Sequence, residues 1–197
     1  MAALQWLAVA LVPVGYLLGT FPSAVIVARR RGVDILSAGS GNPGASNVIR
    51  VLGWRVGAVV LLLDFAKGAA ASGLGLAVGG RGGAYLLGIA AVIGHTFPFG
   101  RKGGKGVAAA GGMLVVLFPL VVLALAVVWL LVSQVLKKAS IASLVIIVAF
   151  PLTVGLTGHA WWETTVIAAV AALLLVRHAA NIRRLVRGEE HDLSQRG

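Results

Sequence analysis

The sequence predicts an all-α polytopic membrane protein, and three observations lead to this fold class. Of the 197 residues, 59% are hydrophobic and only 12% are charged, whereas a soluble domain carries about 25% charged residues. The apolar residues form long runs. Short clusters of Lys and Arg separate these runs. Segments of this kind suit the hydrocarbon core of a bilayer, where they must be helical because lipid offers backbone amides no hydrogen-bond partner.

Seven short apolar segments are predicted to be transmembrane helices, since about 20 residues are needed to cross a core about 30 Å thick. The first has no basic n-region and is too long for a signal peptide. The stretch 105–136 would be about 48 Å long as one helix, so we divide it in two, with a turn near Pro119. In chain order the predicted spans are 4–28, 52–78, 83–99, 105–117, 119–136, 139–158 and 161–177.

The basic residues fix the predicted orientation. With seven crossings, fifteen of the seventeen Lys and Arg residues lie on one side, while Arg81 lies on the other and Lys67 lies within a span. Because basic residues favour the cytoplasmic side, the N-terminus is predicted outside and the C-terminus inside. The formal net charge of +11 is therefore attributed to topology. Nucleic-acid binding, which needs a solvated basic face, is not expected.

No linker is long enough to divide the chain, so residues 1–197 are predicted to form a single integral membrane domain. Glycine pairs four residues apart, such as Gly15 and Gly19, predict close contacts between helix backbones. No internal repeat stands out, which disfavours a transporter built from inverted repeats.

The first polar segment that membrane anchoring does not explain is residues 39–50, GSGNPGASNVIR. It contains G-x-G-x-x-G, but no β-strand precedes it, so a dinucleotide-binding fold is excluded. Small residues let a ligand reach backbone amides, and Arg50 follows about one turn into the next helix, which together favour an anion site. A flexible cytoplasmic loop is the alternative. We expect Ser46 to be placed to cap the helix, and we assign phosphate binding to Gly39, Gly41, Asn42, Gly44, Ser46 and Asn47.

The second polar segment is residues 94–108, GHTFPFGRKGGKGVA. It lacks the Walker spacing, because Gly106 rather than Ser or Thr follows Lys105. A lysine between glycines at the start of an apolar helix still favours phosphate, through its charge and the helix dipole. A basic membrane anchor is the alternative, although anchoring needs no glycines. His95 is interpreted as a structural hydrogen-bonding residue that supports the site, with a catalytic role as the alternative. Phosphate binding is assigned to Lys102, Gly103, Gly104 and Gly106.

The third polar segment is residues 177–190, RHAANIRRLVRGEE. His178 and Asn181 are three residues apart and share a helix face just beyond the seventh span, with Arg184 on about the same side. An amphipathic cationic helix on the lipid surface is the alternative. Within the second span, Asp64 and Lys67 are also three residues apart, which predicts either a structural ion pair or a supporting functional role.

Together these segments resemble the bacterial acyl-phosphate-dependent glycerol-3-phosphate acyltransferases, an integral membrane family with seven spans and three cytoplasmic motifs. The first motif, GSGNxGA[TS]N followed by Arg, is matched from Gly39 to Asn47 and at Arg50. The second, GH…KGGKGVAT, is matched at Gly94, His95 and Lys102 to Ala108. The third, RHxxNIxRLxxGxE, is matched at Arg177, His178, Asn181, Ile182, Arg184, Leu185, Gly188 and Glu190. A DxxKG similar to that of family members is present at Asp64, Lys67 and Gly68.

The resemblance implies that the protein transfers a fatty acyl group from acyl phosphate to the 1-hydroxyl of glycerol 3-phosphate. The products would be phosphate and lysophosphatidic acid, a precursor of phospholipids. It also implies a bacterial inner-membrane location with the active site facing the cytoplasm. By analogy, Ser40, Arg50 and Lys105 are assigned as catalytic residues on the acyl-phosphate side. His178 and Asn181 are assigned to glycerol 3-phosphate, with Arg184 as a further phosphate ligand.

The chemistry of the motifs agrees with this reaction, because they hold many cations and amides and few carboxylates. Phosphate is a good leaving group, so clamping and orienting the substrates are the main tasks. The expected base is a phosphate oxygen of the substrate, with His178 as the second choice. No metal or cofactor is expected, since the chain has no cysteine and no carboxylate cluster. The expected partners are acyl phosphate, glycerol 3-phosphate and the lipid bilayer.

The sequence disfavours two other classes of protein, soluble-type acyltransferases and transporters. The H-x-x-x-x-D signature of soluble-type acyltransferases is absent, since Gly100, Thr164 and Arg183 stand five residues after the relevant histidines. A transporter of a phosphorylated solute would also need cationic clamps. Transporters usually place such clamps near the bilayer midplane on broken helices, whereas these motifs are predicted at one surface.

Overall fold

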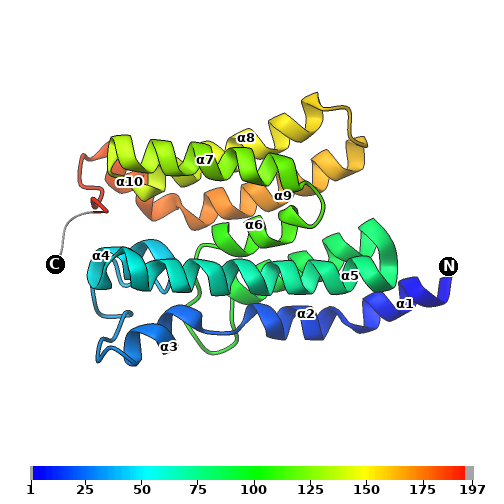
Figure 1. Cartoon of the computed structure of the whole chain (residues 1–197), viewed down its shortest axis with the longest axis horizontal. Coiled ribbons are helices and arrows are strands. Elements are labelled where there is room, and N and C mark those ends of the chain that lie inside the picture. Colours follow the sequence, from blue (N-terminus) through cyan, green and yellow to red (C-terminus); the bar gives the residue numbers. More distant parts are fainter. Residues whose placement is uncertain (1, 194–197) are drawn as a thin grey trace. The chain divides into compact units, whose positions relative to one another are not determined.

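The computed structural model describes residues 2–193, and every regular element within that range is a helix (Figure 1). The predicted cytoplasmic C-terminus and Arg196 lie outside the described residues. The chain forms two units, of which the first ends at Pro119 and the second begins at Leu120. The helices are α1 (Ala2–Ala10), α2 (Val12–Gly19), α3 (Ser23–Arg29), α4 (Ala45–Leu52), α5 (Trp54–Thr96), α6 (Val107–Val115), α7 (Pro119–Leu136), α8 (Ala139–Leu156), α9 (Trp161–Arg177) and α10 (Ala179–Val186).

Several of these helices are long and apolar enough to cross a bilayer, which confirms the predicted fold class as all-helical and membrane-spanning. Helices α9 and α10 are bent by 57° and together provide one further candidate. The other candidates within the described residues are Val12–Arg29, Trp54–Thr96, Pro119–Leu136 and Ala139–Leu156.

Helix α5 contains two predicted spans joined by a reversal. Its 43 residues would extend about 64 Å as one straight helix, twice the thickness of a bilayer core. The backbone leaves the helical region at Gly79 and Gly80, and Gly80 has a φ of 61°, which favours glycine. Gly75 and Gly83 lie so close that a Cβ on either would collide with the carbonyl of the other. The two halves therefore fold back against each other, as the predicted spans 52–78 and 83–99 require.

The first predicted span, residues 4–28, is divided into α1, α2 and α3. A single turn residue, Leu11, separates α1 from α2, and residues 20–22 separate α2 from α3. Pro22 explains the second break, because proline has no N–H to donate and disfavours helical geometry in the residue before it. This interruption was not predicted from the sequence.

Helix α6 is shorter than the predicted span 105–117. Its nine residues rise only about 14 Å, roughly half of the bilayer core. It begins after Gly106, which has a φ of 89°, and a short turn separates it from α7, whose first residue is Pro119 as predicted. It packs closely on α5, since a Cβ at Gly68 would collide with the carbonyl of Ala109. Close packing on another helix thus replaces lipid around much of α6.

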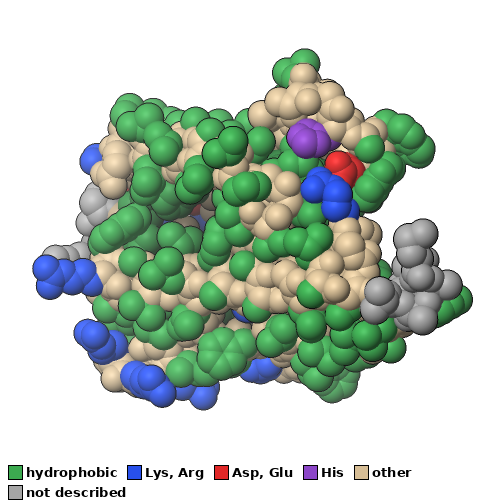
Figure 2. Space-filling model, turned by 45° about the vertical axis from the view of Figure 1, so that its right-hand side comes forward, with side chains coloured by type: hydrophobic (Ala, Val, Ile, Leu, Met, Phe, Trp, Pro, Cys, Tyr) green, Lys and Arg blue, Asp and Glu red, His purple; other side chains and the backbone are tan. Residues whose placement is uncertain are grey.

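In the first unit, α2 lies along the second half of α5 (Figure 1). The predicted glycine contacts are present, because a Cβ at Gly15 or Gly19 would meet the backbone of Leu87 or Ala91, respectively. Hydrophobic side chains cover much of the visible face, and most of the visible Lys and Arg side chains lie toward one end (Figure 2). An apolar surface with basic groups at one end is typical of a membrane protein with one cytoplasmic face.

In the second unit, α8 packs along α9. The indole of Trp129 on α7 donates a 3.1 Å hydrogen bond to the hydroxyl of Ser143 on α8. Such a bond satisfies polar groups that lipid would leave without a partner. The 57° bend between α9 and α10 places His178 at a corner.

Candidate functional site

The first polar loop is organised by the side chain of Asn47, which is 2% exposed. Its Nδ2 donates to the carbonyls of Ala38, at 3.0 Å, and Ile35, at 3.3 Å. Its Oδ1 accepts from the backbone N–H of Ser40 at 2.9 Å and from Arg50 Nη1 at 3.2 Å. Asn47, predicted to bind phosphate, therefore has both polar atoms engaged within the loop.

The same contacts bring two predicted catalytic residues together. Ser40 and Arg50 are ten positions apart in the sequence, and both donate to one oxygen of Asn47. Arg50 is held on α4 and is 9% exposed, while Ser40 is half-buried. Asn47 therefore supports both the backbone of Ser40 and the guanidinium of Arg50.

The start of α4 differs from the sequence prediction in one respect. Gly44 is the N-cap residue, and no side chain caps the helix. Ser46 is the second residue of α4, so the prediction that it caps this helix is wrong. Gly39 and Gly41 have φ values of 57° and 62°, which turn the chain in a way that other residues rarely adopt. Asn42, Gly44 and Ser46 are half-buried along this loop.

The second polar loop packs against the end of α5. The Gly104 N–H donates a 3.0 Å hydrogen bond to the His95 carbonyl, and a Cβ at Gly104 would collide with the His95 ring. A Cβ at Gly103 would likewise collide with the Thr96 carbonyl. These two glycines are therefore required for close packing. Lys105 is half-buried and precedes Gly106, so α6 begins two residues later than predicted.

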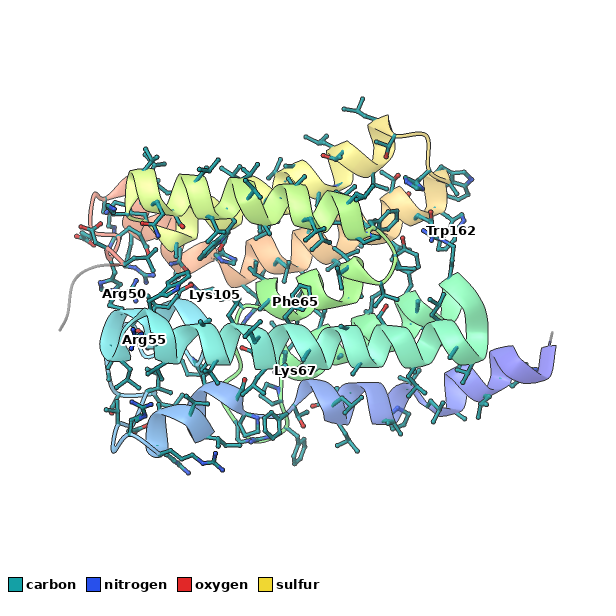
Figure 3. All side chains as sticks on the ribbon, in the orientation of Figure 1. Arg50, Arg55, Phe65, Lys67, Lys105 and Trp162 are labelled. Carbon is teal, nitrogen blue, oxygen red and sulfur yellow. The ribbon has the colours of Figure 1, made fainter. Side chains whose placement is uncertain are left out.

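The structure brings the first and second polar loops into contact. A Cβ at Gly41 would lie 3.5 Å from the Lys102 ammonium, so this lysine extends over the first loop. Arg50 and Lys105 lie toward the same end of α5 (Figure 3). The predicted anion-binding residues of the first unit therefore gather at one end of its helices.

Asp64 and Lys67 form the ion pair that their spacing predicted, with 2.9 Å between Nζ and Oδ1. Both residues are buried. The carboxylate also lies 3.5 Å from His95 Nδ1, which connects the pair to the second polar loop. The hydroxyl of Ser23, which sequence reasoning did not single out, donates to the same carboxylate.

In the second unit, His178 lies between α9 and α10 and is 2% exposed. Its Nδ1 is 2.8 Å from the Leu174 carbonyl. Because a carbonyl only accepts hydrogen bonds, Nδ1 carries the proton, and the Nε2 of a neutral ring is an acceptor. The corner geometry thus fixes the tautomer of this histidine.

Asn181, one turn further along, is held by Glu190. Asn181 Nδ2 donates to Glu190 Oε1 at 2.8 Å, and Arg184 Nε donates to Oε2 at 3.0 Å. Among the described residues, Asn181 Oδ1 has no hydrogen-bond partner although it is buried. An acceptor of this kind is available to a hydroxyl group of a substrate.

Glu190 is the main residue whose role the sequence analysis missed. It is 7% exposed and its two oxygens orient both Asn181 and Arg184. Lys138 supports the same segment, donating to the Glu190 carbonyl and to Asp192. The signal was present, since a carboxylate at the end of a strongly basic segment is a natural partner for its arginines.

No group of three or more His, Asp or Glu side chains within the described residues is arranged to hold a metal ion. The polar groups brought together in the first unit are chiefly amides, a hydroxyl and cations. Such a set suits an anion rather than a metal.

Comparison with known proteins gives consistent results. The family model for glycerol-3-phosphate acyltransferase matches residues 9–188. The glycerol-3-phosphate acyltransferase of Sinorhizobium medicae is 39% identical over 187 residues, covering 93% of this chain and 91% of its own. That of Shewanella loihica is 38% identical over 205 residues, covering 98% and 97%.

Solved structures agree with these sequence comparisons. A crystal structure of PlsY, an integral membrane glycerol 3-phosphate acyltransferase, in its glycerol 3-phosphate form has a TM-score of 0.88 and 36% identity, covering 94% of both chains. Its lysophosphatidic acid form has a TM-score of 0.87 at the same identity, covering 95% of this chain and 96% of that one.

Proposed function

Because this chain belongs to the glycerol-3-phosphate acyltransferase family, we propose that it transfers a fatty acyl group from acyl phosphate to the 1-hydroxyl of glycerol 3-phosphate. The observation that carries this proposal is the meeting of two glycine-rich loops at one end of the first unit. There, Ser40 and Arg50 share the support of Asn47, and Lys102 extends over Gly41. The loops supply cations and amides for phosphate, as both substrates require.

The first unit is assigned to acyl phosphate. In this proposal Arg50 and Lys105 bind the phosphate, and Ser40 and the loop amides donate hydrogen bonds to it. Gly39, Gly41, Asn42, Gly44, Ser46, Lys102 and the glycines of the second loop shape the same anion site. Asn47 supports the site from within, because its amide is already engaged. Negative charge grows on the phosphate as the acyl bond breaks, and nearby cations stabilise this charge.

The second unit is assigned to glycerol 3-phosphate. Asn181 Oδ1 would accept a hydrogen bond from a glycerol hydroxyl, since it lacks a partner among the described residues. His178 would orient the acceptor through Nε2, and Arg184, which keeps two amino groups beyond its bond to Glu190, would meet the phosphate. Glu190 orients Asn181 and Arg184 by accepting a hydrogen bond from each.

The reaction balances without a cofactor. The 1-hydroxyl oxygen of glycerol 3-phosphate bonds to the acyl carbon, and the bond from that carbon to the phosphate oxygen breaks. The hydroxyl proton passes to a phosphate oxygen of the substrate. Phosphate leaves readily, so the protein mainly supplies position and charge. His178 is the second candidate for the base.

We propose seven membrane crossings with the polar loops on the cytoplasmic side of a bacterial inner membrane. The fifteen-to-one division of basic residues supports this orientation. Helix α6 is short, but non-helical backbone is tolerated at membrane depth when protein surrounds it. Gly103, Gly104 and Gly106 are all buried. Residues on both sides of α6 can therefore complete its crossing.

Cysteine labelling tests this topology. Single cysteines at the exposed positions Glu189 and Gly80 should react with an impermeant reagent from opposite sides of the membrane. Labelling of both from the same side would contradict seven crossings.

A direct assay tests the proposed reaction. Purified protein with acyl phosphate and glycerol 3-phosphate should release phosphate and form lysophosphatidic acid, and acyl-CoA should give little product. Equal turnover with acyl-CoA at matched concentration would contradict the donor assignment. The alternative of a solute transporter lacks support, because the reported relatives are all named acyltransferases.

A further inference from the structure

A buried carboxylate in the first unit has more partners than an ion pair alone would need. Asp64 is 2% exposed. It accepts a hydrogen bond from the Ser23 hydroxyl, pairs with Lys67 at 2.9 Å and lies 3.5 Å from His95 Nδ1. A carboxylate at membrane depth is costly unless its oxygens are well satisfied. These partners come from α3 and from both halves of α5, so Asp64 ties three helical segments together.

One of these partners leads directly to the second polar loop. With Nδ1 toward Asp64, the opposite edge of the His95 ring faces Gly104, where an added Cβ would collide with Nε2. The His95 carbonyl also accepts the Gly104 N–H at 3.0 Å. Gly104 immediately precedes Lys105. The orientation of the His95 ring therefore decides where the backbone that carries this lysine can lie.

Residues at the break between α2 and α3 also form hydrogen bonds near the second polar loop. The carbonyls of Thr20 and Phe21 are left without helical partners by the break, and they accept from Arg101 Nη2 and Lys67 Nζ, both at 3.1 Å. Tyr16 donates from α2 to the Phe97 carbonyl at 2.9 Å. Lys67 points from α5 toward α2 and α3 (Figure 3). Hydrogen bonds to α2 and to the break after it therefore hold both ends of the segment 97–101.

A purely structural ion pair would account for Asp64 and Lys67, but not for the remaining contacts. The carboxylate touches His95, His95 touches the glycine loop, and the loop carries two of the proposed phosphate ligands, Lys102 and Lys105. Asp64 itself is separated from those ligands by the histidine. Its influence on catalysis must therefore be indirect.

We propose that Asp64 is a positioning residue, which acts through His95 to hold the loop 102–106 in its phosphate-binding conformation. This inference rests on the proposed function. Phosphate binding by a loop requires its amides and ammonium groups to be placed before the ligand arrives, because ordering them during binding weakens affinity. The His95 ring, packed against Gly104, keeps the loop in one conformation. The contacts of Ser23 and Lys67 with Asp64 hold its carboxylate beside His95.

The test compares two carboxylate–histidine pairs in which the carboxylate is buried. Asp64→Asn keeps the size of the side chain and removes its charge. The control is Glu163→Gln in the second unit, where Glu163 is 3% exposed and lies 3.9 Å from His159, with no part in the proposed site. Ser23→Ala is a milder variant that keeps the Asp64 charge, and it keeps the proposal testable if Asp64→Asn does not fold.

Two measurements are made on full-length protein in detergent, and the melting temperature of each variant is recorded beside them. The first is kcat and KM for acyl phosphate, and the second is the rate at which trypsin cleaves after Arg101, Lys102 and Lys105, relative to cleavage after Lys137 and Lys138. We expect Asp64→Asn to lower kcat/KM by roughly 10- to 100-fold and to accelerate loop cleavage selectively. Ser23→Ala should change both in the same direction by less, and Glu163→Gln should change neither.

The outcomes separate the inference from the function on which it rests. Wild-type protein without acyltransferase activity would reject the proposed function, whereas trypsin cleavage would still report on the loop. Active wild type with unchanged kinetics and cleavage in Asp64→Asn would overturn the positioning role. Equal losses of activity in Asp64→Asn and Glu163→Gln, tracking their melting temperatures, would also overturn it by showing a general loss of stability.

Discussion

Two buried asparagines, Asn47 in the first unit and Asn181 in the second, belong to polar motifs that look alike in composition but differ in what their side chains contact. Asn47 uses both Nδ2 and Oδ1 within its own loop. Asn181 donates to Glu190, and its Oδ1 has no partner among the described residues. The first side chain stabilises its own loop, and the second leaves one acceptor that we propose for a ligand.

The same difference separates the two regions as a whole. In the first unit, side chains and glycines shape loops whose remaining binding groups are charges and amides, which suit phosphate. In the second unit, the segment after the corner at His178 presents Asn181 Oδ1, an acceptor that suits a hydroxyl group, and Glu190 holds Arg184 as well as Asn181. The comparison predicts that variants of the first region alter catalysis or folding, and that variants of the second alter recognition of glycerol 3-phosphate.

The largest effect is expected from Lys105→Ala. Loss of a charge that stabilises the departing phosphate should cost about 3–4 kcal/mol, or roughly 100- to 1000-fold in kcat. Steady-state kinetics with acyl phosphate measures this loss. Arg31→Ala is the matched control, because Arg31 is an exposed basic residue outside both loops and its removal should leave kcat unchanged. A similar loss in both variants would point to general electrostatics instead.

Asn47→Ala should chiefly lower stability. The change removes hydrogen bonds to four partners and leaves buried groups without them, so we expect a loss of about 2–4 kcal/mol. A melting curve of the purified protein in detergent measures it. Asn47→Asp should recover part of the loss, since a carboxylate can still accept from Ser40 and Arg50. A stable Asn47→Ala protein with only a raised KM would contradict the supporting role.

Asn181→Ala should instead raise KM for glycerol 3-phosphate by about tenfold, equivalent to about 1.4 kcal/mol. The effect on melting temperature should be smaller than that of Asn47→Ala, because only one described side-chain bond is lost. Kinetics at varied glycerol 3-phosphate and fixed acyl phosphate provide the measurement. An effect confined to KM for acyl phosphate would reverse the assignment of the two substrates.

The smallest effect on the chemical step is expected from His178→Ala. If this residue orients the acceptor, its loss should raise KM for glycerol 3-phosphate several-fold and leave kcat nearly intact. The pH dependence of kcat should then show no histidine limb that disappears in the variant. An unchanged KM with kcat abolished, together with loss of such a limb, would make His178 the general base and reject the substrate phosphate in that role.

Much of the fold followed from local sequence. Long apolar runs determine helices in lipid, because the backbone has no alternative partner there. The reversal at Gly79 and Gly80, the turn before Pro119 and the glycine contacts of α2 were all predictable from composition and spacing. The interruption before Pro22 and the shortness of α6 were not predicted, because apolar runs show hydropathy but not where a helix ends.

Sequence by itself also predicted which segments carry the proposed chemistry, since basic residues alone would serve for anchoring and the accompanying glycines and amides would not be needed. Only the tertiary structure decided what each residue does there. Asn47 and Asn181 are the same amino acid, yet their roles depend on whether a neighbouring carbonyl or carboxylate is within reach. Asp64 and His95 are 31 positions apart along the chain, and they come into contact because α5 folds back on itself. The composition of each segment determines whether that segment enters the lipid. The hydrogen-bond partners of a side chain depend instead on which distant segments pack against it.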